Sequence, residues 1–115
     1  MSLPRRFQWV TGLDPSRADR YFELHAHPWP GVLKRIKDSN IQNFSISVQE
    51  IDGKPYLFAY LEYVGEDFDG DMKKMADDPE TQRWWKETDP CQIPLPDAVA
   101  SGGIWSSARE VFYLR

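Results

Sequence analysis

The first residues that could take part in chemistry are Tyr21 and His25, which are four positions apart. In a helix this spacing puts both side chains on one face. Histidine titrates near neutral pH and can both take up and release a proton, so this face could support acid–base catalysis. The spacing alone favours an ordinary core histidine that is hydrogen-bonded to a carbonyl oxygen. His27 falls on another side of the same helix and is not expected to act with His25.

A second unusual feature is the adjacent pair Trp84 and Trp85. Aromatic faces stack on the C–H faces of sugars, and an indole N–H can bond a hydroxyl group. Neighbouring side chains on a helix diverge by ~100°, so both rings can line one pocket only where the helix bends or ends. Residues 88–90, Thr-Asp-Pro, place such an end nearby. The sequence leaves open whether the pair forms a ligand surface or puts one ring in the core with the other as cover.

Other kinds of catalytic site find little support. The two histidines and the single cysteine, Cys91, are far apart in the sequence, which disfavours a metal site. The chain has no GxSxG motif, no phosphate-binding glycine loop and no dinucleotide fingerprint. Most carboxylates fall in charged stretches such as residues 66–71, which are typical of a solvated surface.

Length and charge narrow the possible partners. The 115 residues fit a single domain, residues 1–115, with a modest core that a partner subunit often extends. The formal net charge of −4 and the scattered Lys and Arg residues disfavour binding to nucleic acid. The N-terminal segment lacks the apolar run of a signal peptide, and no segment is long enough to span a membrane. One cysteine fits a reducing compartment, so we expect a cytoplasmic protein.

Alternating strands and helices must position these residues. The sequence predicts strands at residues 5–11, 41–51, 54–63 and 111–114. A first helical region is predicted to begin after Asp14-Pro15 and to break at Pro28 and Pro30. A second covers residues 72–86 and restarts at Asp78-Pro79. Residues 88–103 are rich in proline and glycine and are expected to form an ordered loop. The order β-α-β-β-α-β is the ferredoxin-like pattern of an α+β fold.

Asp52-Gly53 predicts a two-residue hairpin turn, which would pair residue 51 with residue 54. One face of the hairpin is then aliphatic and suits helix packing: Phe44, Ile46, Val48, Leu57, Ala59 and Leu61. The other face carries Phe58 and Tyr60 among polar residues. A solvated face would not normally carry two such rings together, so we expect a subunit contact there.

Five segments occur in the order that a known family has. They are Tyr21-x-x-x-His25-x-x-x-Trp29-Pro30, Asn43-Phe44, Leu57-Phe58-Ala59, Gln82-Arg83-Trp84-Trp85-Lys86 and Glu110-Val111-Phe112-Tyr113-Leu114. Together they resemble the L-rhamnose mutarotase family over nearly the whole chain. The RWWK segment followed by a terminal EVFYL is the most specific part of the resemblance.

The resemblance implies a homodimeric α+β barrel and an isomerase that interconverts the anomers of L-rhamnose or a related free monosaccharide. It implies that His25 is the catalytic residue and that the sugar is bound by Tyr21, Phe44, Trp84 and Trp85. The family has a tyrosine where this chain has Phe44, so one hydroxyl hydrogen bond is missing, which bears on the identity of the sugar. Ring opening needs only acid–base assistance, so no cofactor and no metal are expected.

Two other functions stay open at the level of the sequence. Cofactor-free oxygenases and lactone isomerases also use dimeric ferredoxin-like barrels, and the fold does not choose between these reactions. A sugar-binding or regulatory module that has lost turnover is the non-enzymatic alternative. Sugar binding without faster anomer exchange would indicate the module, and oxygen uptake with an aromatic substrate would indicate the oxygenase.

Overall fold

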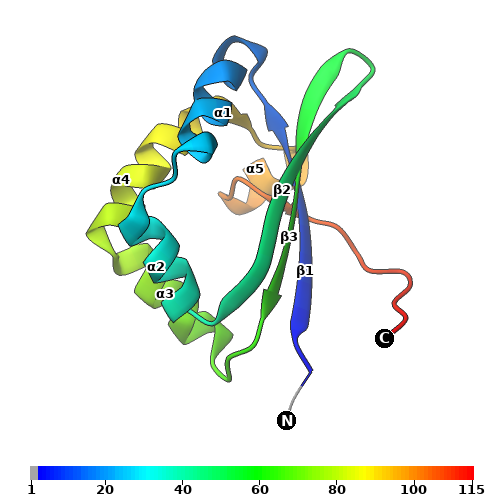
Figure 1. The fold of residues 1–115 in the computed structure, drawn as a ribbon. Helices are drawn as coiled ribbons and strands as arrows, with labels where there is room; N and C mark the ends of the chain where they lie inside the picture. Colours follow the sequence, from blue (N-terminus) through cyan, green and yellow to red (C-terminus); the bar gives the residue numbers. More distant parts are fainter. Residues whose placement is uncertain (1–2) are drawn as a thin grey trace.

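The computed structural model describes residues 3–115, which form a curled antiparallel sheet with helices over one face (Figure 1). The strands are β1 (Arg5–Leu13), β2 (Ile41–Ile51), β3 (Lys54–Tyr63), β4 (Gln92–Ile93) and β5 (Ser106–Ser107). The helices are α1 (Ala18–Ala26), α2 (Pro30–Asp38), α3 (Phe68–Asp77), α4 (Pro79–Thr88) and α5 (Pro96–Ser101), with short 3₁₀ helices η1 (Pro15–Arg17) and η2 (Asp89–Cys91). The strand order β2-β3-β1-β4 confirms the predicted ferredoxin-like fold, and β5 also pairs with β1.

The helices begin where the capping residues predict. The side chain of Asp14 accepts a hydrogen bond from the backbone N–H of Ser16 at 2.9 Å, and a proline follows at the first position of η1. Asp78 caps α4 in the same way through the N–H of Thr81, also at 2.9 Å. Between α1 and α2 the chain leaves the helix at His27 and restarts at Pro30, so the predicted break is confirmed.

The hairpin of β2 and β3 closes through the predicted turn. Asp52 and Gly53 both have positive φ, 53° and 77°, as the two-residue turn requires. Ile51 pairs with Lys54, and the predicted register continues along the hairpin to the pair of Ser45 and Tyr60.

The register then shifts between Gln42 and Ser45, which pair with Glu62 and Tyr60. Asn43 and Phe44 therefore lie opposite the single residue Leu61, and Asn43 has a φ of 50°. An extra residue of this kind is a β-bulge and bends the strand. Phe44 lies at this bend and is 40% exposed, whereas the sequence pattern placed it on the aliphatic face with the core residues.

The core lies between the sheet and the helices. Its buried residues form three clusters: Leu13, Tyr21, Leu57 and Cys91; Ile41, Leu61, Tyr63 and Met75; Leu24, Val32 and Trp84. The first two clusters contain alternate residues of β3, which point to the helix side of the sheet. The third cluster packs α1, α2 and α4 against one another. It lies next to the first cluster, because His25 contacts both Trp84 and Tyr21.

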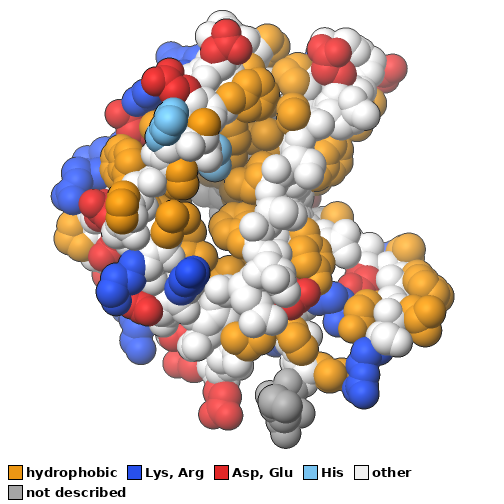
Figure 2. Space-filling model, in the orientation of Figure 1, with side chains coloured by type: hydrophobic (Ala, Val, Ile, Leu, Met, Phe, Trp, Pro, Cys, Tyr) orange, Lys and Arg blue, Asp and Glu red, His pale blue; other side chains and the backbone are white. Residues whose placement is uncertain are grey.

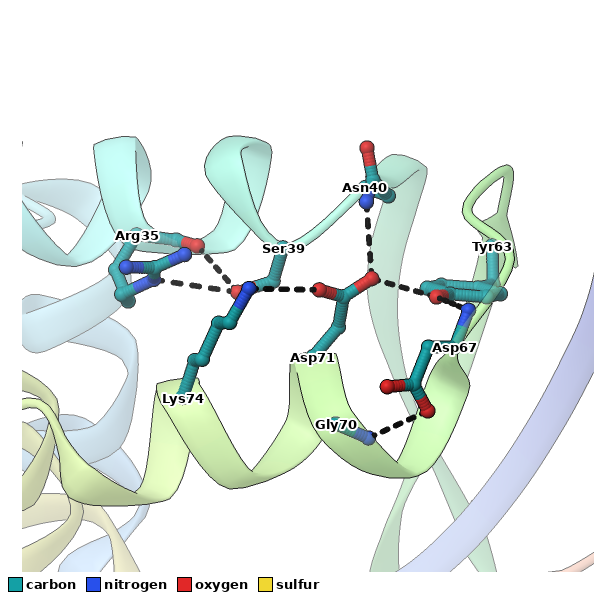
Figure 3. Close-up of polar contacts among 8 residues, drawn as sticks. All are labelled: Arg35, Ser39, Asn40, Tyr63, Asp67, Gly70, Asp71 and Lys74. Carbon is teal, nitrogen blue, oxygen red and sulfur yellow. Dashed lines mark hydrogen bonds and ion pairs between the residues drawn. The ribbon is translucent and has the colours of Figure 1, made fainter.

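A buried polar network ties the helices to the sheet at the end of β3 away from the hairpin turn (Figure 3). The Asp71 carboxylate accepts hydrogen bonds from the Tyr63 hydroxyl at 2.5 Å and from Asn40 Nδ2 at 2.9 Å. The Tyr63 hydroxyl in turn accepts one from the backbone N–H of Asp67 at 3.0 Å. These bonds, the one from Tyr63 above all, hold the pKa of Asp71 below its ordinary value.

The prediction of a last strand at residues 111–114 is wrong. These residues form no strand, and the side chains of Val111, Phe112 and Leu114 are 82%, 78% and 81% exposed. The tail runs away from the sheet on the side opposite the helices (Figure 1). Arg6 holds its start, with one ion pair to Glu110 at 2.7 Å and a guanidinium over the Tyr113 ring.

The fourth strand of the ferredoxin-like order is instead β4, inside the stretch that was predicted as a loop. β4 pairs with β1 over two residues, and a Cβ at Gly12 would come within 2.6 Å of the Ile93 carbonyl oxygen, so a glycine is needed for this close pairing. The same stretch contains α5. A two-residue strand is too short to show the alternation that reveals a longer one, which explains why the sequence pattern missed it.

None of the helices within residues 3–115 combines the length and the apolar character that crossing a membrane requires.

Candidate active site

A hollow opens between the helical layer and β2, and hydrophobic side chains line its walls (Figure 2). One of the two histidine side chains lies at its margin in this view. The helices α1 and α2 form one side of the opening and β2 forms the other (Figure 1). The residues of α1 that face the sheet are therefore the first candidates for chemistry.

His25 lies on α1 and is partly buried. Its Nδ1 is 2.8 Å from the backbone carbonyl oxygen of Tyr21. A carbonyl can only accept, so Nδ1 must carry the proton in the neutral ring, and Nε2 is left with a lone pair. Burial lowers the pKa of His25, and the hydrogen bond to Tyr21 opposes this effect only in part. The ring is therefore a neutral base at neutral pH.

Aromatic rings hold the imidazole from two sides. The Tyr21 ring stacks on it with centroids 4.2 Å apart and an interplanar angle of 28°. Trp84 of α4 meets it edge-on, with centroids 5.3 Å apart, and Trp29 packs edge-on against Trp84 at 5.1 Å. Trp29 reaches this position because the chain breaks between α1 and α2. The packing fixes the orientation of the imidazole and creates an aromatic surface beside it.

Tyr21 is 3% exposed, and burial raises its pKa to about 12, so its hydroxyl stays protonated at neutral pH. The side-chain amide of Gln92 lies 3.5 Å from this hydroxyl and donates to it over a long hydrogen bond. The phenol O–H remains a donor. Gln92 belongs to β4, which the sequence pattern did not predict, so no signal in the sequence pointed to it.

The other two predicted sugar-binding residues lie outside the cluster formed by Tyr21, His25 and Trp84. Helix α4 runs through the tryptophan pair to Thr88, and adjacent side chains on a helix point in different directions, so the two rings diverge. Trp84 is 7% exposed and Trp85 37%. Phe44 lies on the bulge of β2. Among residues 3–115, neither Trp85 nor Phe44 makes an aromatic contact with His25.

Other parts of the described chain offer less to chemistry. Within residues 3–115, no group of three or more His, Cys, Asp or Glu side chains is arranged to hold a metal ion. A cavity of about 320 Å³ between the hairpin and residues 93–96 is lined by prolines and other mainly apolar residues. A cavity of about 90 Å³ lies beside β1 at the start of the C-terminal tail. Neither is lined by a histidine, which leaves the His25 cluster as the candidate site.

Comparison with known proteins points to one family. A model described as L-rhamnose mutarotase matches residues 6–114. The L-rhamnose mutarotase of Bacillus subtilis (strain 168) is 33% identical over 96 residues, which cover 84% of this chain and 85% of that protein. The L-rhamnose mutarotase of Acidiphilium cryptum (strain JF-5) is 31% identical over 103 residues, or 89% of this chain and 90% of that protein.

A solved structure shares the fold. The crystal structure of an L-rhamnose mutarotase from Formosa agariphila superimposes with a TM-score of 0.70 and covers 96% of this chain and 99% of its own. The two sequences are 23% identical, so this likeness supports the architecture. The curled sheet and the helical layer are thus found in a mutarotase structure as well.

Proposed function

Since the chain belongs to the L-rhamnose mutarotase family and is an isomerase that interconverts the α and β anomers of L-rhamnose, we propose that His25 moves the proton of this reaction. The observation that carries the proposal is the hydrogen bond from Nδ1 to the Tyr21 carbonyl oxygen, which leaves Nε2 with the basic lone pair of the ring. One base that is neutral at physiological pH and held in one orientation is what the chemistry needs.

The reaction transfers one proton between two oxygens on the same carbon. C1 of the cyclic sugar carries the hydroxyl oxygen O1 and the ring oxygen O5. Nε2 of His25 takes the proton from O1 and delivers it to O5, while the C1–O5 bond breaks and the C1=O1 bond forms. After rotation about C1–C2, the O5 hydroxyl attacks the other face of the carbonyl, and the proton returns through Nε2 to O1. Histidine assistance of this kind contributes ~10²–10⁴-fold.

Tyr21 and Trp84 are proposed to bind the sugar next to His25. Trp84 contacts the imidazole directly and is 7% exposed, so a sugar that touches the accessible edge of its indole would lie beside His25. The Tyr21 hydroxyl keeps its proton and can donate to a sugar oxygen, with Gln92 holding the phenol from behind.

Trp85 and Phe44 are proposed to contact the sugar from the margin of the hollow. Both side chains are about two-fifths exposed, with 37% for Trp85 and 40% for Phe44. Phe44 offers an apolar ring where the family resemblance predicts a hydroxyl. A phenylalanine cannot donate that hydrogen bond, so the sugar panel of the test includes free sugars related to L-rhamnose.

The test is anomer exchange measured by saturation-transfer NMR with L-rhamnose and a panel of other free sugars, without added cofactor. We expect faster exchange of L-rhamnose than the buffer alone gives. Exchange at the buffer rate for every sugar would contradict the proposal. Binding of L-rhamnose without faster exchange would instead indicate a sugar-binding module.

We further propose that residues 1–115 form one mutarotase domain that pairs into a homodimer. Phe58 on the outer face of β3 is 38% exposed, and the apolar tail leaves the molecule on the same side of the sheet. Burying these side chains against a second copy would remove an apolar surface that water otherwise contacts. Sedimentation at micromolar concentration should give twice the 13.4 kDa of the chain, and Phe58→Asp should weaken the association. A wild-type species of 13.4 kDa alone would contradict the dimer.

We also propose a cytoplasmic location. The single cysteine, Cys91, is buried and forms no disulfide, and a free thiol of this kind is typical of proteins in a reducing compartment. Cell fractionation would test it: recovery of the protein with the secreted fraction would contradict it.

A further inference from the structure

We propose that Trp105 is a further sugar-contacting residue, and that it selects sugars with a methyl group on C5 over those with a hydroxymethyl group. The inference rests on the function proposed above, because it concerns the wall of the same site. Trp105 was not among the residues that the sequence pattern pointed to.

The position of Trp105 links it to the catalytic cluster. Its partly buried ring packs against the core cluster that contains Tyr21, and Tyr21 stacks on His25. It also meets Trp9 of β1, with ring centroids 6.4 Å apart and an interplanar angle of 38°. Trp9 pairs with the buried Ala59, so it points to the helix side of the sheet. Trp105 therefore lies on the side of the sheet where the His25 cluster is.

The backbone on both sides of Trp105 is anchored. Just before it, the carbonyl oxygen of Ile104 accepts a hydrogen bond from the Thr11 hydroxyl at 2.8 Å. Just after it, Ser106 pairs with β1, and its hydroxyl donates to the Asp97 carboxylate at 2.6 Å. The loop between α5 and β5 thus holds the indole in place before any ligand arrives, as a residue that shapes a binding site requires.

The segment that carries Trp105 lies on the far side of the opening between helices and sheet. In Figure 1, α5 is seen behind that opening, opposite the edge formed by β2. The surroundings of the indole are largely apolar, since it meets the Trp9 ring and packs against the buried cluster of Leu13, Tyr21, Leu57 and Cys91. A sugar that enters from the β2 side would lie alongside the His25 cluster. The end of the sugar that enters first would then meet this apolar wall.

The chemistry of the sugar says which group meets this wall. His25 must reach O1 and O5, and O5 is bonded to C5. The substituent of C5 is therefore close to the reacting atoms and must be accommodated beside the His25 cluster. A methyl group can be buried against an indole, whereas a hydroxymethyl group would lose its hydrogen bonds to water there. An apolar pocket rejects an added hydroxyl by ~10²-fold at most.

L-rhamnose and L-mannose are a matched pair for the test, because they differ only in the hydroxyl on C6. We would measure kcat/KM for anomer exchange of both sugars by saturation-transfer NMR, with the wild type and the variants Trp105→Ala and Trp105→Phe. Val99→Ala serves as the control, because Val99 lies on α5 but is 63% exposed. Circular dichroism would verify the fold of each variant.

The wild type should prefer L-rhamnose by roughly 10- to 100-fold. Trp105→Ala should lower that ratio at least about fivefold, through slower exchange of L-rhamnose, because the methyl group loses its apolar contact. Trp105→Phe should lower the ratio measurably but by less than Trp105→Ala does, and Val99→Ala should leave it unchanged. If the alanine variant does not fold, a partial fall of the ratio in Trp105→Phe decides in favour of the inference.

A wild type that does not prefer L-rhamnose over L-mannose would overturn the inference. An unchanged ratio of the two kcat/KM values in a folded Trp105→Ala protein would also overturn it. If Trp105→Ala does not fold, an unchanged ratio in Trp105→Phe has the same meaning. These outcomes leave the mutarotase activity itself intact. A wild type that accelerates neither sugar would contradict the proposed function. The two failures are therefore distinguishable.

Discussion

Nδ1 of His25 lies 2.8 Å from the backbone carbonyl oxygen of Tyr21, one helical turn earlier in α1. The carbonyl fixes the tautomer, because its oxygen accepts a hydrogen bond from the protonated Nδ1. Nε2 is therefore the basic nitrogen of the ring. The stacked Tyr21 ring and the edge of Trp84 fix the plane of the imidazole. A hydrogen bond between a core histidine and a carbonyl is the structural role that spacing alone favoured, and the same bond is compatible with the proposed acid–base role of Nε2.

The first prediction concerns the loss of this nitrogen. His25→Ala should lower kcat for L-rhamnose exchange by ~10²–10⁴-fold, because a proton-transfer group acts in the transition state. KM should change less. Saturation-transfer NMR gives both constants. His27→Ala is the matched control, since His27 is exposed at the end of α1 and should leave the rate unchanged. Near-normal exchange by a folded His25→Ala protein would make His25 a structural residue.

The second prediction concerns the pH dependence. In the proposed mechanism the reaction starts from a neutral imidazole, and burial lowers the pKa of His25 from its ordinary value of 6.5. The base form is therefore retained as the pH falls through 6.5. We expect kcat/KM, after subtraction of the spontaneous rate, to stay constant from neutral pH downward and to fall only below 6.5. A midpoint at or above 6.5 would contradict a buried histidine as the base.

The third prediction separates the two tryptophans. Trp84 packs in the core with Leu24 and Val32, so Trp84→Ala should lower the free energy of unfolding by about 3–5 kcal/mol and also raise KM. Trp85→Ala should raise KM with little loss of stability, because Trp85 is 37% exposed. Urea unfolding and exchange kinetics on the same preparations would measure both effects. Equal losses of stability in the two variants would contradict the assigned positions.

Local signals in the sequence predicted much of the fold. Asp14, Asp78 and the Asp52-Gly53 turn each act through neighbours a few residues away, so their effects can be read without knowledge of the tertiary structure. The same is true of the one-turn spacing of Tyr21 and His25. The stacking of these two rings confirms that they share a face of α1.

The remaining features depend on contacts between distant segments. The β-bulge at Asn43 and the two-residue strand β4 have no periodic pattern of their own. Residues 111–114 are apolar and looked like a strand, but β4 and β5 already occupy the edge of β1. Gln92 lies on β4 and Trp105 directly before β5, so the positions of both depend on this unpredicted edge, which the sequence pattern did not show.

The last prediction concerns stability at low pH. Hydrogen bonds from Tyr63 and Asn40 hold the pKa of Asp71 below its ordinary value of 3.8. The folded protein then binds fewer protons than the unfolded chain, so this contribution to stability is complete above the unfolded pKa and is lost as the pH falls through the folded pKa.

Tyr63→Phe removes the stronger donor. It should lower the melting temperature by several degrees at pH 7, and its difference from the wild type should begin to shrink as the pH falls below 3.8, the ordinary pKa of Asp71, toward the lower pKa that this carboxyl group has in the folded wild type. Thermal unfolding followed by circular dichroism between pH 7 and pH 3 measures this difference. Asp77→Asn is the control, because the ion pair of Asp77 with Lys73 is exposed and should contribute little. A difference between Tyr63→Phe and the wild type that stays constant over this range would show that the Tyr63 hydroxyl does not act through the charged form of Asp71.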